Sequence, residues 1–102
     1  MMRSTLPGAA LLALALPSLA QPVTPPALRS ARQDLRECII RNAGWASART
    51  EATPDNVADA AAKACADNYV KTVVRRRLMD KAQAKVETNM MAYNVAYKIL
   101  GR

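Results

Sequence analysis

Cys38 and Cys65 carry the best-defined chemistry in this chain of 102 residues. Two thiols form a disulfide in an oxidising compartment if the fold brings them together. The midpoint of the pair falls beside Thr53 and Pro54, where the sequence indicates a turn and a helix start. The two cysteines are therefore equally distant from this turn. In an antiparallel helical hairpin, residues equally distant from the turn lie opposite each other. We therefore predict a Cys38–Cys65 disulfide, with two buried free thiols as the alternative.

The remaining chemistry-bearing side chains form no catalytic pattern. The chain has no His, which is the commonest general base and the commonest zinc ligand. After Gly8 only Gly44 and Gly101 remain, too few for a phosphate-binding loop. Asp55 and Asp59 lie near a helix start, where the helix dipole accounts for them. We predict that the protein is not an enzyme and holds no cofactor or metal.

A cationic band lies just after the middle of the chain, and the whole chain has a net charge of +7. A basic balance favours anionic partners such as a membrane surface, an envelope polymer or an acidic protein. The alternative is a solvated helix face partly paired with Asp80 and Glu87. The band is our candidate site for an anionic partner, and it comprises Arg75, Arg76, Arg77, Lys81 and Lys85.

The C-terminal segment is apolar on more than one side, and Met and Tyr are adaptable residues common at interfaces. We interpret it as a face that binds a protein partner, a second copy of the chain or an anionic membrane surface. A third helix that completes an internal core is the alternative. The candidate association face comprises Leu78, Val86, Met90, Tyr93, Tyr97 and Leu100.

The first 20 residues have the three parts of a secretory signal peptide. Arg3 supplies the positive charge, an apolar stretch follows, and Ser18, Leu19 and Ala20 form a cleavage site after Pro17. We predict that 1–20 is a signal peptide cleaved near Ala20, and that the protein is periplasmic or secreted. Export makes nucleic acid a poor candidate partner. Residues 21–26 are then a proline-rich extended tail, and 27–102 a single helical domain.

Helical periodicity begins at Ala27 and continues to between Gly44 and Arg49. Its predicted apolar stripe comprises Leu28, Ala31, Leu35, Cys38, Asn42 and Trp45. A second helix begins at Pro54, and its apolar stripe changes direction at 75–77. No Gly or Pro interrupts the chain between Pro54 and Leu100, which favours one long helix.

The predicted fold is thus all-α, a disulfide-stapled antiparallel helical hairpin with a long second helix. A three-helix bundle with a break near 75–80 is the alternative. A long second helix would leave its half after Arg77 beyond the reach of the first helix, so that half would need another partner.

The stretch 57–61 (Val-Ala-Asp-Ala-Ala) leads to Ala64 and Cys65. This segment resembles small, functionally uncharacterised exported bacterial proteins with an alanine-rich helical hairpin and one cysteine in each arm. The resemblance implies a periplasmic setting and no activity. Acid-stress periplasmic chaperones are also small, helical and single-disulfide, but their cysteines are more widely spaced.

The function predicted from these features is that of a non-enzymatic envelope protein. It would bind a protein partner, or itself, through residues 74–100. A cationic helical protein that acts on anionic membrane or envelope polymer is the alternative, and a small periplasmic stress chaperone ranks below both.

Overall fold

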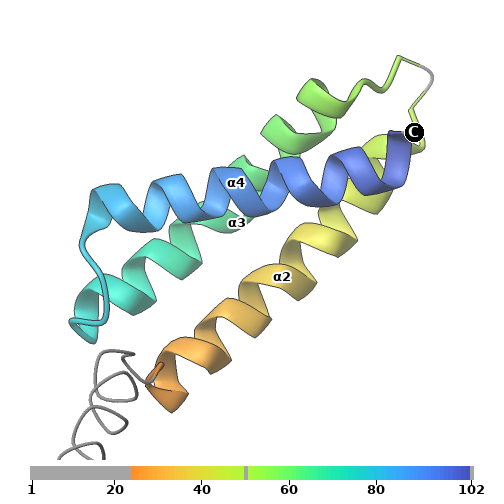
Figure 1. Cartoon of the computed structure of the whole chain (residues 1–102). Helices are drawn as coiled ribbons and strands as arrows, with labels where there is room; N and C mark the ends of the chain where they lie inside the picture. Colours follow the sequence, from red (N-terminus) through yellow and green to blue (C-terminus); the bar gives the residue numbers. More distant parts are fainter. Residues whose placement is uncertain (1–23, 50, 102) are drawn as a thin grey trace, which may run out of the picture.

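The computed structural model describes residues 24–49 and 51–101, and these form three α-helices without a strand. The helices are α2 (Pro26–Ser47), α3 (Pro54–Arg75) and α4 (Lys81–Leu100). α4 runs back along α3 and ends beside the turn that joins α2 to α3 (Figure 1). The all-α prediction is confirmed. The long second helix is wrong, and the three-helix bundle with a break near 75–80 is the arrangement found.

The predicted signal peptide, 1–20, lies outside the described residues, as do the first three residues of the proline-rich tail. Thr24 and Pro25 are not helical, and Pro26 occupies the first position of α2. The Thr24 carbonyl accepts a hydrogen bond from Arg29 Nη1 at 2.9 Å. A proline at this position costs the helix no hydrogen bond, because the first N–H groups of a helix have no partner within it.

α3 begins where the sequence predicted. Thr53 Oγ1 accepts a hydrogen bond from the Asn56 backbone N–H at 3.1 Å, and Pro54 is the first helical residue. Asp55 lies in the first turn, where the positive end of the helix dipole favours a carboxylate. All three residues favour a helix that begins at Pro54, so this boundary could be predicted.

The break between α3 and α4 forms without glycine or proline. Arg77 has φ 58°, in the left-handed region, and its N–H donates to the Val74 carbonyl at 3.0 Å. The Leu78 N–H donates to the Val73 carbonyl at 2.8 Å, which completes a Schellman motif. Asp80 Oδ1 then accepts a hydrogen bond from the Gln83 N–H at 2.8 Å and caps α4.

The core lies between the three helices and is made largely of small side chains. α2 buries Leu28, Ala31, Leu35, Ile39 and Ala43. α3 buries Val57, Ala58, Ala61, Ala62, Cys65, Tyr69 and Val73, and α4 buries Ala84, Thr88, Ala92, Val95 and Ala96. Short side chains let helix axes approach closely. The closeness agrees with the separation of 5.9 Å between the Cα atoms of Cys38 and Cys65.

The predicted stripe of α2 is correct in its first half and wrong at its end. Ile39 and Ala43 are fully buried, whereas Trp45 is 67% exposed. The predicted stripe advances by 3.4 residues per turn on average, and a straight helix has 3.6. The small difference accumulates along α2, so the buried face has moved away from Trp45 by the last turn.

Candidate binding face on α2 and α4

α4 directs its small residues inward and its large apolar residues outward. Ala84, Thr88, Ala92 and Ala96 are completely buried. The buried Thr88 hydroxyl donates to the Ala84 carbonyl at 2.9 Å, so its polar group is satisfied within the helix. Five large apolar side chains of the same helix are exposed by 41–61%, namely Val86, Met90, Tyr93, Tyr97 and Ile99. A helix stabilised only by its own core would show the opposite distribution.

Four residues of the predicted association face share one outward stripe of α4. Val86, Met90, Tyr93 and Tyr97 recur at steps of four, three and four, so they follow the same side of the helix. The rings of Tyr93 and Tyr97 are stacked, with centroids 6.1 Å apart. The negative charge of Asp55, in the first turn of α3, raises the pKa of Tyr93.

Leu78 and Leu100, the other two residues predicted for that face, are partly buried against the core. Leu78 belongs to the turn that reverses the chain, and Leu100 is the last residue of α4. The fold therefore divides the predicted face into four outward residues and two that help to close the bundle.

A groove runs between α2 and α4, and we call it the α2–α4 groove. Its main part has a volume of about 780 Å³ and is lined by Arg36, Glu87, Met90, Met91, Asn94, Val95, Tyr97 and Lys98. A second hollow of about 450 Å³ shares Arg36 and Met91 with it and extends along α2 past Arg29, Arg32, Gln33 and Glu37. The groove thus combines methionine and tyrosine side chains with cations from both helices.

One polar cluster joins all three helices beside this groove. Arg32 of α2 donates to Glu87 of α4 through Nε, at 3.1 Å to Oε1, and through Nη2, at 2.6 Å to Oε2. The hydroxyl of Tyr69, from α3, donates to the same Oε1. Two parallel N–H···O bonds from one guanidinium hold a carboxylate in a single orientation. The cluster therefore fixes the position of α4 relative to both α2 and α3.

The ionisation of these three groups reflects their mutual contacts. Partial burial by itself raises the pKa of Glu87, but the hydrogen bonds from Arg32 and Tyr69 outweigh it and leave that pKa below its ordinary value. Burial and the adjacent Glu87 carboxylate raise the pKa of Tyr69 to about 12. The hydrogen bond with Glu87 also raises the pKa of Arg32. At neutral pH the cluster is a charged pair with a neutral tyrosine.

The predicted cationic band lies at and after the turn between α3 and α4. Its five members are exposed, and none forms an ion pair with another residue in the described part of the chain. The alternative pairing with Asp80 and Glu87 is wrong, because Asp80 caps α4 and Glu87 binds Arg32. Figure 1 shows that the turn lies at the same end of the bundle as the start of α2.

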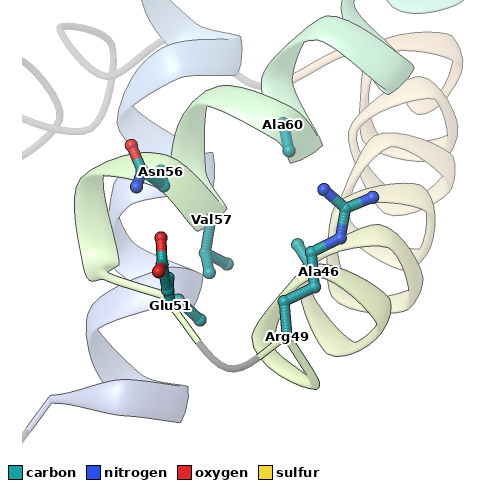
Figure 2. Close-up of a pocket in the computed structure, with 7 residues that line it drawn as sticks. Ala46, Arg49, Glu51, Asn56, Val57 and Ala60 are labelled. Atoms are coloured by element: carbon teal, nitrogen blue, oxygen red, sulfur yellow. The ribbon is translucent and has the colours of Figure 1, made fainter.

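A separate hollow of about 400 Å³ opens at the other end, beside the turn between α2 and α3. Figure 2 shows Arg49 and Glu51 on opposite sides of Val57 there. Small side chains, Ala46 and Ala60 among them, contribute to the lining. One cation and one carboxylate with no nucleophile or base beside them do not form a catalytic arrangement.

The predicted disulfide joins Cys38 of α2 to Cys65 of α3. Asn42 Nδ2 donates to the Cys38 carbonyl at 2.8 Å and lies 3.5–3.6 Å from both sulfur atoms. Asn42 therefore covers the disulfide from the neighbouring turn of α2, and this partner explains why a polar residue interrupts the predicted apolar stripe.

No known protein family, curated protein or solved structure matches this chain. Within 24–49 and 51–101, no helix is long and apolar enough to cross a membrane. The same residues contain no group of three or more Cys, Asp or Glu side chains placed to hold a metal ion. The α2–α4 groove and the outward stripe of α4 form the candidate functional site.

Sequence reasoning missed the groove and the Arg32–Glu87–Tyr69 cluster, because both depend on the reversal of the chain before α4. Two signals for that reversal are present. Asp80 followed by Gln83 is a helix-start pattern of the capping-box type. Small residues at every fourth position of α4, Ala84, Thr88, Ala92 and Ala96, mark a face suited to close helix packing.

Proposed function

We propose that the protein is an exported, non-enzymatic binding protein whose working surface is the outward stripe of α4 with the α2–α4 groove. One observation carries the proposal. α4 buries alanine and threonine while it exposes Val86, Met90, Tyr93 and Tyr97. Exposed apolar side chains gathered on one stripe mark an interaction surface, whereas the same residues scattered singly would mean little.

The residue types support a protein partner. Tyrosine and methionine are enriched at protein interfaces, and tyrosine offers both an apolar ring and a hydroxyl for the partner. The face is also built on a helix that the Arg32–Glu87–Tyr69 cluster and the core hold in place. A rigid face loses little conformational entropy when it binds, which favours affinity.

A second candidate function is attachment to an anionic membrane surface or envelope polymer through the cationic band. The exposure of all five cations, without ion pairs to other described residues, favours it. Ionic strength separates the two functions. Attachment through surface cations weakens steeply as salt rises, whereas apolar contact through α4 does not.

Site-specific photo-crosslinking in intact cells tests the proposal. A photoreactive amino acid replaces Met90 or Tyr97 in turn, and Ile40 of α2 is the matched control because it is also apolar and 50% exposed. We expect protein adducts of one or a few discrete sizes from positions 90 and 97 and none of these from position 40. The change Val86→Ser should reduce the same adducts. Equal adduct patterns from all three positions would refute a binding face on α4.

A further inference from the structure

We infer that the partner segment is an acidic amphipathic α-helix that lies in the α2–α4 groove. The inference rests on the proposed function and names the chemistry of the partner. The groove joins cations to an apolar surface: Arg29 and Arg36 line it from α2, and Lys98 lines it from α4. Met90 and Met91 line the same groove.

The positive charge of the groove is largely available to a partner. Glu87 is already bound by Arg32 and Tyr69, so it does not neutralise another cation. Glu37 accepts a hydrogen bond only from the neutral Gln33, at 3.4 Å, so it keeps one negative charge beside Arg29, Arg36 and Lys98. Neither Arg36 nor Lys98 forms an ion pair within 24–49 or 51–101. An occupant with carboxylates along its flanks would pair with these cations while its apolar side met the methionines.

The shape of the groove fits a helix. The lining of α4 extends from Glu87 to Lys98, which is about 16 Å at 1.5 Å per residue. A helix of the partner can lie along the groove between α2 and α4 and insert its side chains at i, i+3/i+4 and i+7. Methionine side chains adapt to the shape of such inserted residues.

A second copy of the chain suits the groove poorly. Pairing of two grooves across a two-fold axis would bring Arg29, Arg36 and Lys98 of each copy close to the same cations of the other. The outward side of α3 does carry acidic residues, Asp55, Asp59 and Asp67, but exposed neighbours such as Ala60 and Ala64 are too small to act as anchors. A flat membrane surface matches the exposed cationic band better than it matches a concave groove.

Fluorescence anisotropy with designed peptides tests the inference on the purified, oxidised protein. The probe is a labelled peptide of about 18 residues, or five helical turns, with leucine at i, i+3 and i+4 positions and glutamate elsewhere. One control peptide has lysine in place of glutamate, and another has the same composition in an order without helical amphipathicity. We expect the acidic amphipathic peptide to bind at least about tenfold more tightly than either control.

Charge reversal locates the binding. The double variant Arg36→Glu with Lys98→Glu should lower the affinity for the acidic peptide by at least about tenfold. The matched control, Arg75→Glu with Arg76→Glu, makes the same change of charge outside the groove and should leave most of the affinity. Far-UV circular dichroism checks that both variants are folded.

Each other outcome overturns the inference. Equal binding of the acidic and basic peptides, or equal loss in both double variants, would exclude the groove as an acidic-helix site. So would preferential binding to phosphatidylglycerol-containing vesicles that only the Arg75/Arg76 variant loses. Discrete crosslinks at position 90 without binding of the acidic peptide would overturn the partner chemistry and leave the proposed function intact. Absence of both would refute the two together.

Discussion

Replacement of Arg77 by glycine is expected to stabilise the protein, although Arg77→Gly removes a side chain in the middle of a helical chain. Arg77 has φ 58°, which glycine adopts without the clash that a Cβ causes. An L-residue in this region costs about 1–2 kcal/mol. Glycine also has more freedom in the unfolded chain, which costs about 0.5–1 kcal/mol. The net gain should be about 0.5–1 kcal/mol.

Two control variants separate backbone conformation from charge. Arg76 has φ −86°, so Arg76→Gly removes one charge of the same band without relief of any strain and should destabilise by about 0.5–1 kcal/mol. Arg77→Ala removes the charge but keeps the Cβ, so its effect should be close to zero. The opposite signs expected at two adjacent arginines make the comparison independent of electrostatics.

Thermal unfolding followed by circular dichroism measures these differences. About 1 kcal/mol corresponds to about 4–8 °C in a domain of this size, so Arg77→Gly should raise Tm by about 2–8 °C. If the helix were continuous through 75–80, both glycine variants would be expected to lower the Tm. There each glycine would cost about 1 kcal/mol, and both variants would melt at lower temperature than the parent protein. A fall in Tm for Arg77→Gly would therefore refute the break.

The remaining predictions concern the core, the polar cluster and the tryptophan. Reduction of the disulfide, whose cysteines are 27 residues apart, should lower the free energy of unfolding by about 3.5 kcal/mol in urea titrations. Glu87→Gln should cost about 1 kcal/mol at pH 7. That difference should shrink as pH falls below 4.5 and through the lowered pKa of Glu87, because the protonated carboxyl loses its pairing with the guanidinium. Ala92→Leu should destabilise by about 1–3 kcal/mol, whereas Met90→Leu on the outward stripe should change the Tm little. Trp45 should fluoresce as a tryptophan in water does and be fully quenched by acrylamide; a blue-shifted, protected emission would contradict its exposure.

Local signals predicted the parts of the fold that depend on neighbouring residues. The start of α3 follows from Thr53, Pro54 and Asp55, because each acts on the backbone within one turn. The disulfide was predicted because its two cysteines are equally distant from the turn between α2 and α3. In an antiparallel hairpin such residues lie opposite each other. Both inferences need only the geometry of one helix pair.

The chain reversal could not be read from glycine and proline alone. The absence of both residues from 55–99 favoured a continuous helix, yet the chain turns with Arg77 in the left-handed region. The energy for this comes from tertiary packing, since the reversal places α4 against α2 and α3 and buries the face that runs from Ala84 to Ala96. Burial of several side chains exceeds the cost of about 1–2 kcal/mol at one strained residue.

On α4, contact within the monomer and the predicted association face use residues of different size. The small residues pack against the other helices, whereas Val86, Met90, Tyr93 and Tyr97 of the predicted face remain exposed. Close approach of α4 to the other two helices leaves room on its buried face for alanine, threonine and one valine. Most of its larger apolar side chains then lie outside and are 41–61% exposed, whereas Met91 and Leu100 pack against the core.

The same packing separates stability from the proposed binding on α4. Substitution at Ala92 or Thr88 alters the core, because both are completely buried, whereas substitution at Met90 or Tyr97 alters only the outer surface. The Arg32–Glu87–Tyr69 cluster connects the two roles, since it holds α4 beside α2 and thereby maintains the distance across the groove. Loss of Glu87 should therefore weaken acidic-peptide binding through a changed groove even though the carboxylate itself repels the peptide. A gain in peptide affinity for Glu87→Gln would show instead that charge, rather than the position of α4, controls the site.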